Sequence, residues 1–371
     1  MKRFRRCILF FIAGGLLVCI LGALISALSN RGLPSVPASL DVMTDLDKAR
    51  LAEALHLKQL LGAEIWPGLG EADIPVLLWN RGFSFLVNFP AAPDGWEEVA
   101  GDSFLEQAYY RQPTDDHQNF AVEVGGQWVA SLGTKWETDA FMMEMFQDVL
   151  PPVIEDIFPY RLLILPSEVQ ITGVLHESFH VYQMQVAPER LVAAEDSHQS
   201  GDPYWQVDEA MHAEWEREIH LLRQALESGS DQQAAEYVRQ FLEARQERRS
   251  AHSLSSEFII FEQAFEWEEG LAKYVELESW RRAYESGGGY VPVSGMEEDP
   301  EFKVYRTFKQ RWSQELSQME RQANQAGDTR FYYTGMAQAK LLDRLMPDWK
   351  TRILGEVLWL DRLLAEAISP Q

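Results

Sequence analysis

The chain has 371 residues, 46% of them apolar and 24% charged, so it can bury a sizeable core in one large domain or two. Five of its 33 basic residues and none of its 57 acidic residues lie in positions 1–31, which leaves 28 basic against 57 acidic residues, a formal charge of −29, for the rest. Such a surface repels phosphate groups and excludes nucleic acid as a partner. Both cysteines, Cys7 and Cys19, precede residue 31, so disulfides and thiolate metal sites are excluded from the rest of the chain.

The amino terminus combines four basic residues in positions 1–6 with an uncharged apolar run from Cys7 to Leu28. The run is long enough to cross a bilayer as a helix and longer than the apolar part of most cleaved signals. It predicts a cytoplasmic stub and transmembrane signal-anchor in residues 1–30, which places the rest of the chain in the periplasm or outside the cell. Residues 27–29, Ala-Leu-Ser, also suit a cleavage site, so a cleaved signal is the alternative. Residues 31–40 contain two prolines and predict a linker.

The domain that follows, residues 41–371, begins with a helix predicted over 41–61 and then changes to short strands in a sheet-rich part, 70–135. Two hairpins are predicted, because Asn-Arg-Gly and Gly-Gly each separate a pair of apolar runs. The predicted strands are Val76–Trp79 with Phe83–Asn88, Phe120–Val124 with Gln127–Leu132, and a further strand over Phe104–Tyr110. They predict a small antiparallel sheet of four or five strands.

From residue 136 to 371 the pattern is helical, and prolines and glycines mark the breaks. Helices are predicted at 138–149, 151–158, 167–187, 205–227, 231–249, 255–284, 301–325 and 331–367. The predicted fold class is α+β, with an N-terminal transmembrane helix, the small antiparallel sheet and a large helical body. Sheet and body are expected to form one unit.

The helix predicted at 167–187 contains His176, Glu177 and His180 in the order His-Glu-Ser-Phe-His. Positions i and i+4 lie on one face of a helix, so both imidazoles can point at one cation. Glu177 can reach a metal-bound water without binding the metal, and zinc lowers the pKa of such a water to ~7. The pattern resembles the H-E-x-x-H motif of zinc-dependent hydrolases and implies a zincin-like active-site helix. The alternative is two buried core histidines.

A zinc site needs a third protein ligand. Residues 265–276, Phe-Glu-Trp-Glu-Glu-Gly-Leu-Ala-Lys-Tyr-Val-Glu, resemble the glutamate helix of the gluzincin metallopeptidases, especially the M1 aminopeptidase type. In that family the glutamate before the glycine binds zinc, so the resemblance implies Glu269 as the third ligand. Gly270 and Ala272 are small and suit a close approach to the motif helix. The tryptophan is one residue closer than in the family, and the gap of 89 residues from His180 to Glu269 is longer.

Residues 208–214, Asp-Glu-Ala-Met-His-Ala-Glu, offer an alternative third ligand. They resemble the Asn-Glu-Ala segment of thermolysin-like enzymes, which implies Glu209, or Glu214 on the same segment, as the ligand. That pattern also has an aspartate four residues after the ligand to orient a histidine, and Ala213 stands there instead.

A hydrolase also needs a donor for the oxyanion that forms as water attacks. Gluzincins use a tyrosine or a histidine, so the resemblance implies such a residue here. Tyr333, in a Tyr-Tyr pair before the last helical stretch, is the expected donor, and His252 is the alternative.

Together these features predict a membrane-anchored, extracytoplasmic metallopeptidase that uses Zn²⁺ to hydrolyse a peptide or protein substrate. Glu177 is expected to act as general base and then to give its proton to the leaving amine. One alternative is a catalytically inactive, peptidase-like binding protein, suggested by the long insertion between the two zinc helices. A second is a di-iron carboxylate protein, suggested by Glu-x-x-His pairs at 177–180 and 209–212 with Glu266 or Glu269 as a bridge.

Overall fold

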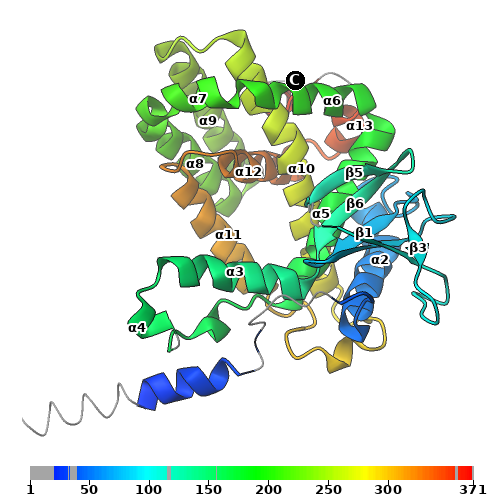
Figure 1. The fold of residues 1–371 in the computed structure, drawn as a ribbon. Coiled ribbons are helices and arrows are strands. Elements are labelled where there is room, and N and C mark those ends of the chain that lie inside the picture. Colours follow the sequence, from blue (N-terminus) through cyan, green and yellow to red (C-terminus); the bar gives the residue numbers. More distant parts are fainter. Residues whose placement is uncertain are drawn as a thin grey trace, which may run out of the picture.

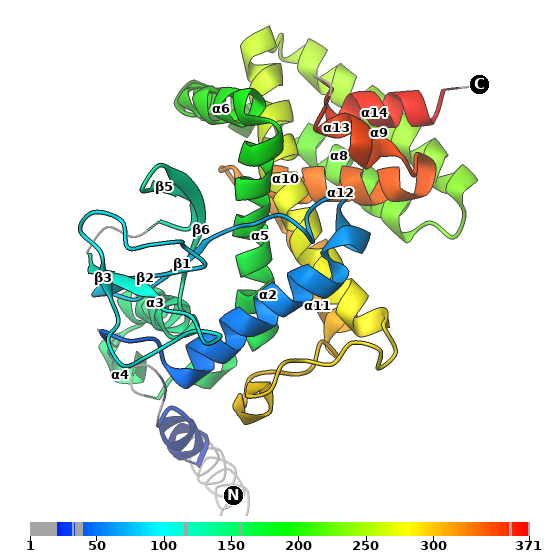
Figure 2. The same ribbon diagram turned by 90° about the vertical axis from the view of Figure 1, so that its right-hand side faces the viewer.

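The computed structural model describes residues 21–31, 33, 40–114, 118–155, 157–355 and 358–369. These residues form a mostly helical molecule with one small sheet (Figure 1). Two long helices, α5 (Ser167–Val186) and α10 (Ser256–Glu285), run side by side through its middle. The sheet lies to one side of this pair, and most of the later helices lie to the other (Figure 2).

The sheet has six strands in the spatial order β3-β4-β2-β1-β6-β5. Their bounds are β1 (Val76–Trp79), β2 (Phe83–Val87), β3 (Glu97–Glu98), β4 (Tyr110–Pro113), β5 (Phe120–Val124) and β6 (Gln127–Gly133). The predicted β1–β2 and β5–β6 hairpins are confirmed. Alternate side chains of β1 face opposite ways, since Val76 and Leu78 join the main core with α5 whereas Leu77 packs with Tyr110 and Val129.

The predicted fold class is wrong about the sheet. Strand β1 pairs with β6 in parallel, with Val76 opposite Ala130, so the sheet is mixed rather than antiparallel. The chain returns across the sheet after β4, and the second hairpin therefore docks beside β1 and packs against α5. The strand predicted over 104–110 is largely a loop, in which Phe104 and Gln107 form an isolated bridge before β4 begins. The α+β prediction is corrected to a mostly helical fold with a small mixed sheet.

The predicted transmembrane helix is also contradicted. Residues 21–29 are helical, and the part of the apolar run before Leu21 lies outside the described residues. A helix needs about 20 apolar residues to cross a bilayer, and none of the described helices combines that length with that apolarity. This finding overturns the expected single-pass topology and the extracytoplasmic localisation derived from it.

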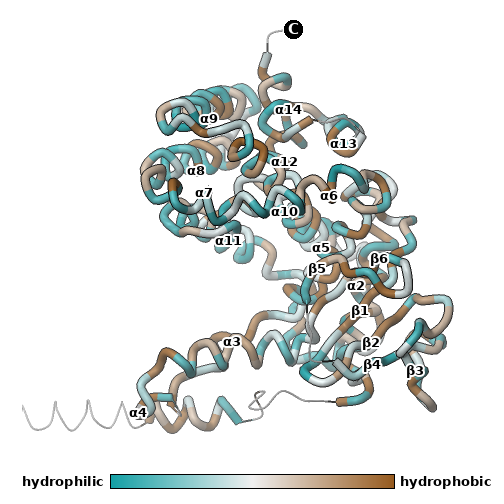
Figure 3. Tube along the Cα trace, turned by 45° about the horizontal axis from the view of Figure 1, so that its top comes forward, coloured by the Kyte–Doolittle hydropathy of each residue, from teal (hydrophilic) through white to brown (hydrophobic). Residues whose placement is uncertain are grey.

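The other helices largely follow the predicted pattern. They are α2 (Asp45–Ile65), α3 (Lys135–Val149), α4 (Pro152–Glu155), α6 (Pro188–Ser197), α7 (Gly201–Asp208), α8 (His212–Glu227), α9 (Asp231–Ala251), α11 (Phe308–Gln322), α12 (Thr329–Leu345), α13 (Trp349–Ile353) and α14 (Leu360–Ala367), with 3₁₀ turns η1 (Tyr160–Leu162), η2 (His198–Ser200), η3 (Glu209–Met211) and η4 (Met296–Glu298). The long helix predicted over 331–367 is divided because Pro347 cannot continue α12. Hydrophilic and hydrophobic residues alternate along α8 and α9 (Figure 3), as expected for helices that bury one face.

Helices α10 and α12 cross at two glycines. A Cβ atom added at Gly270 would lie 2.5 Å from Gly335 Cα, and one added at Gly335 would lie 2.7 Å from Gly270 Cα. A packed interior has no room for atoms at such separations, so larger residues here would force the helices apart. This crossing also places Glu269 and Tyr332 relative to each other, because Gly270 follows Glu269 and Gly335 lies one turn after Tyr332.

A buried ion pair joins the same two helices to α9. Arg245 donates hydrogen bonds to both carboxylate oxygens of Glu266, at 2.6 and 2.8 Å, and the Thr334 hydroxyl donates to Glu266 at 2.7 Å. Both charged residues are buried, and removing Arg245 would leave the charge of Glu266 uncompensated in the core, whereas Arg245 also contacts Glu218, at 3.1 Å. Helices α9, α10 and α12 are therefore held together by one carboxylate.

Gly335→Ala should lower the midpoint of thermal unfolding by about 5 °C or more, because the added methyl group has to push α12 away from α10. Gly229→Ala is the matched control, since a Cβ atom added there has no heavy atom within 4 Å. Circular dichroism during heating measures both variants. Equal midpoints for the two would contradict the close crossing.

Candidate metal centre

Helix α5 carries the three residues of the His-Glu-Ser-Phe-His motif. It begins directly after Pro166, contains no internal proline and buries most of its residues. His176 is only 8% exposed and His180 is fully buried, and their ring centroids lie 5.0 Å apart. The spacing of one helical turn therefore places both imidazoles on one face of α5, as the sequence predicts.

Glu269 on α10 brings a carboxylate oxygen to this pair. Its Oε2 atom lies 3.2 Å from His176 Nε2 and 3.3 Å from His180 Nε2. One ligand atom from each of these three buried residues falls within 4.8 Å of the others, which is close enough for the three to hold a metal ion. The structure thus brings together the three residues expected to bind zinc, and metal binding itself stays a prediction.

Burial and close opposite charges control protonation in this cluster. Burial alone would raise the pKa of Glu269, but the neighbouring imidazoles of His180 and His176 hold it well below its usual value. Burial alone would lower the pKa of His176, but hydrogen bonds to Glu269 and Glu276 raise it to about 10. The carboxylates therefore raise the pKa of both imidazoles and favour their protonated forms, and a divalent cation would bind in place of those protons.

Glu177 lies beside the cluster, and burial affects the pKa of its carboxyl group more than the neighbouring imidazoles do. Burial raises the pKa of its carboxyl to about 7, although the imidazoles of His176 and His180 act to lower it. Its Oε2 atom is buried and has no hydrogen-bond partner in the described part of the chain. A carboxyl group whose pKa lies near neutrality can accept a proton and give it back, which is the requirement for a general base that becomes a general acid.

The Nδ1 atoms of both imidazoles, which point away from Glu269, have partners that orient the rings. Gln183 Oε1 lies 3.0 Å from His180 Nδ1, and the Gln183 amide also donates to the backbone carbonyl of Trp267, at 3.1 Å. Glu276 Oε2 lies 3.6 Å from His176 Nδ1. Both contacts favour a proton on Nδ1 and leave Nε2 directed at Glu269, the arrangement that metal-binding histidines adopt. Neither Gln183 nor Glu276 was among the residues expected from the sequence.

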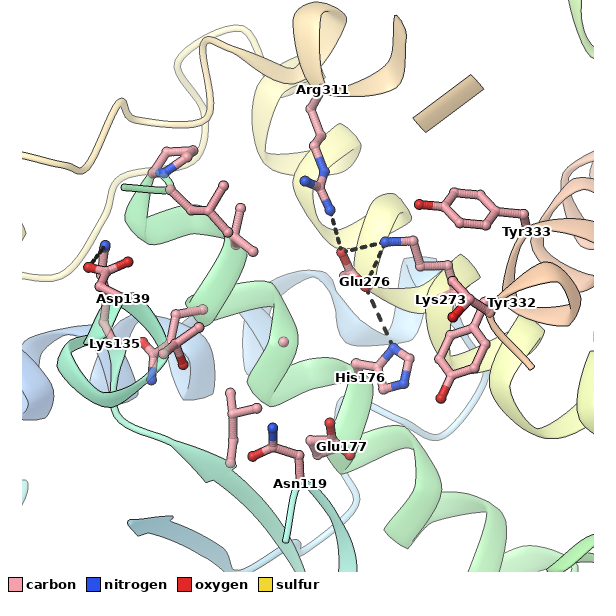
Figure 4. A pocket seen from close by; sticks show the side chains of 18 residues that line it. Asn119, Lys135, Asp139, His176, Glu177, Lys273, Glu276, Arg311, Tyr332 and Tyr333 are labelled. Atoms are coloured by element: carbon pink, nitrogen blue, oxygen red, sulfur yellow. Dashed lines mark hydrogen bonds and ion pairs between the residues drawn. The ribbon is translucent and has the colours of Figure 1, made fainter. Parts of the chain in front are cut away.

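A cavity of about 400 Å³ opens beside this cluster (Figure 4), and we call it the metal-side cavity. Its wall includes His176 and Glu177, together with an apolar part and a charged part. The apolar part is Leu132, Leu165, Pro166, Val169 and Gly173; the charged part is Lys135, Asp139, Lys273, Glu276 and Arg311. The charged residues pair with acids, since Lys135 contacts Asp139 at 2.5 Å, and Glu276 accepts from Lys273 at 3.0 Å and from Arg311 at 3.3 Å.

The two tyrosines of α12 both reach this cavity but differ in what they contact. The ring of Tyr332 stacks on His176, with centroids 6.0 Å apart and an angle of 14° between the planes. Burial and the charge of Glu269 hold the pKa of Tyr332 well above its usual value, so the group is a hydroxyl donor. Tyr333, the expected oxyanion donor, instead faces Lys273 and Glu315. Figure 4 shows Tyr332 nearer to His176 and Glu177 than Tyr333 is.

The competing candidates lie elsewhere. Glu209 is exposed, and Glu214 is half-buried and contacts His252 at 3.4 Å. Glu266, a proposed di-iron bridge, is bound by Arg245. Among the alternatives considered from the sequence, Glu269 alone places its carboxylate against the histidine pair.

Comparisons of the chain with protein-family models, with curated proteins and with solved structures each found no match. The resemblance to gluzincins therefore rests on the two sequence motifs alone.

Glu269→Gln should reduce zinc affinity by 10-fold or more, because a neutral amide is a poor replacement for the carboxylate ligand. Glu209→Gln is the matched control, since Glu209 is exposed and was the competing ligand. Competition with a zinc chelator measures both dissociation constants. A weaker affinity in the Glu209 variant and an unchanged one in the Glu269 variant would contradict the assignment.

Proposed function

We propose that the protein is a zinc-dependent metallopeptidase. The observation that carries this proposal is the convergence of His176, His180 and Glu269 beside an orphaned, buried Glu177 at the edge of a cavity. Two histidines and one carboxylate form the donor set of a catalytic zinc site that keeps one position open for water or substrate. A purely structural site would instead be expected to have four protein ligands.

Zinc fits these residues better than calcium or magnesium does. Two imidazole nitrogens and one carboxylate suit a borderline-soft ion, whereas calcium and magnesium require six or more oxygen ligands. The Gln183 and Glu276 contacts supply the outer support that such a site needs. When bound, zinc supplies a water molecule acidic enough to attack a carbonyl at neutral pH.

Side chains of the protein supply the proton transfer, the stabilisation of the oxyanion and the binding of the substrate. Glu177 accepts the proton of the attacking water and returns it to the leaving amine, which its pKa of about 7 permits in both directions. Tyr332 donates its hydroxyl to the oxyanion that develops on the attacked carbonyl, because it faces the metal ligands and remains protonated. The apolar wall of the metal-side cavity receives part of the substrate and excludes water.

An exposed sheet edge beside α5 supports a peptide as the substrate. Strand β5 is the last strand on its side of the sheet and pairs only with β6 within the described residues. The ring of Phe120, its first residue, lies 4.6 Å from the ring of His180. An extended peptide that added to this edge would pass directly by the histidine pair.

Glu177→Gln should lower kcat by about 10²-fold or more while the protein still binds one zinc ion, because the amide cannot accept the proton of the attacking water. A library of quenched fluorescent peptides measures turnover, and elemental analysis measures zinc. Unchanged turnover would refute the role of Glu177. Wild-type protein that contains zinc and cleaves no peptide of the library would refute the peptidase proposal.

Tyr332→Phe should lower kcat by about 10²-fold with little change in KM, because the hydroxyl acts only on the charge that develops in the transition state. Tyr333→Phe is the matched control, since that hydroxyl faces Lys273 and Glu315. Steady-state kinetics on one peptide measures both variants. The reverse ranking would restore Tyr333 as the donor.

A further inference from the structure

A second cavity, of about 350 Å³, lies next to the amino-terminal half of α10, and we call it the aromatic pocket. It is formed by η2, α7, α10 and the turn that leads into α12. Its wall includes His198, Asp202, Trp205, Phe261, Phe265 and Asp328.

Ring contacts build one side of the aromatic pocket. His198 stacks on Phe265 with centroids 4.0 Å apart and an interplanar angle of 13°. Phe265 contacts Phe261 edge-on at 5.0 Å, and Phe261 contacts Trp205 edge-on at 5.8 Å. The two phenylalanines are nearly fully buried, whereas Trp205 is partly exposed. His198 covers Phe265, so Trp205 is the ring available to a ligand, and the electron-rich face of a tryptophan attracts a cation more strongly than that of the other aromatic residues.

The two aspartates of the aromatic pocket give it a negative charge that no neighbouring basic residue of the described chain neutralises. Asp202 and Asp328 are exposed, and neither forms an ion pair or a side-chain hydrogen bond with another residue that the structure describes. The imidazole of His198 already contacts Glu268, at 3.1 Å. The metal-side cavity differs, because its wall already holds three basic residues, Lys135, Lys273 and Arg311, which pair with its acidic residues and repel a further cation. A positively charged group therefore gains more in the aromatic pocket than in the metal-side cavity.

The aromatic pocket lies about one helical turn from Glu269 along α10 and about one turn from Tyr332 along α12. Phe265 precedes Glu269 by four residues on α10, which is ~6 Å along a helix axis. Asp328 precedes Tyr332 by four residues at the start of α12. His198 also links the two regions, since it contacts both Phe265 and Glu268.

The proton transfer by Glu177 determines which side of the scissile bond faces each cavity. In the proposed peptidase reaction Glu177 protonates the leaving amine, so the amine side of the scissile bond lies in the metal-side cavity, which Glu177 lines. The acyl side then extends away from that cavity, past the metal ligands. The aromatic pocket lies in that direction along α10, because its Phe265 precedes Glu269 whereas Lys273 and Glu276 of the metal-side cavity follow it.

We propose that the aromatic pocket binds the guanidinium or ammonium group of the substrate residue that precedes the scissile bond, so that the protein prefers peptides with arginine or lysine at that position. This inference rests on the proposed peptidase function. The trunk of a long basic side chain spans the helical turn between the scissile carbonyl and the pocket. A free α-amino group does not, because it lies only two bonds from the same carbonyl carbon.

The test compares peptides that differ by one charge. Acetylated, quenched fluorescent peptides carry either arginine or citrulline, its neutral isostere, at one position, and mass spectrometry of the products identifies the cleaved bond. Cleavage should follow arginine, with kcat/KM about tenfold higher than for citrulline. The arginine peptide with a free amino terminus should be cleaved at the same bond and at a similar rate.

Asp328→Asn should remove most of the preference for arginine over citrulline, measured as the ratio of the two kcat/KM values. Glu209→Gln, an exposed acid that does not line the aromatic pocket, is the matched control and should keep the full preference. Equal cleavage of the two peptides by the wild-type protein would overturn the assignment of the pocket and leave the peptidase proposal standing. A preference only for free amino termini would also overturn it, in favour of recognition of the α-amine.

Measurements of peptide binding test the aromatic pocket independently of peptide cleavage. With Glu177→Gln protein, calorimetry should give a dissociation constant about tenfold lower for the arginine peptide than for the citrulline peptide. If the wild-type protein cleaves neither peptide, the peptidase proposal fails, and this difference in affinity still tests the pocket. Equal affinities, or no binding of either peptide, would overturn the inference.

Discussion

The approach of α5 to α10 is the constraint on which the rest of the structure depends. Two imidazoles one helical turn apart face a single carboxylate oxygen of Glu269, at 3.2 and 3.3 Å. This contact removes the carboxylate from water, and the desolvation free energy is unfavourable unless opposite charges offset it. Here the imidazoles offset it, and the pKa of Glu269 falls well below its usual value as a result. A divalent cation would stabilise the carboxylate further, because it would place a positive charge between the three ligands.

The surrounding fold keeps this contact from relaxing. Gln183 contacts His180 and the backbone of α10 with the same amide, so it fixes the ring and the helix spacing together. The crossing at Gly270 and Gly335 holds α12 against α10 and brings Tyr332 over His176. Arg245 and Thr334 then hold Glu266, which lies three residues before Glu269 on α10. Each element of the candidate site is thus supported by a buried polar contact or by a close backbone approach.

The local parts of this fold could be predicted from the sequence, and the long-range parts could not. Apolar periodicity and Gly-Gly or Asn-Arg-Gly turns identified the helices and both hairpins, because these signals act within a few residues. The parallel pairing of β1 with β6 joins segments about 50 residues apart, and no local pattern encodes it. The apolar run before residue 29 suggested a membrane span from composition alone, and none of the helices that the structure describes is long and apolar enough to cross a membrane.

The candidate site shows the same division. The His-Glu-x-x-His spacing placed His176 and His180 on one face. Gly270 was expected to allow a close approach to α5, but it lies against Gly335 of α12 instead, so the reason given for choosing Glu269 was wrong although Glu269 does lie against the histidine pair. The choice between Tyr332 and Tyr333 failed because neighbouring residues on a helix point about 100° apart. Only the placement of α12 decides which of them faces the ligands.

X-ray absorption at the zinc edge of the purified protein tests the central claim most directly. One zinc ion per chain, with scattering from two imidazoles and an oxygen donor at ~2.0–2.1 Å, is the predicted result. A protein reconstituted with zinc that retains no stoichiometric ion, or an ion without imidazole scattering, would contradict it.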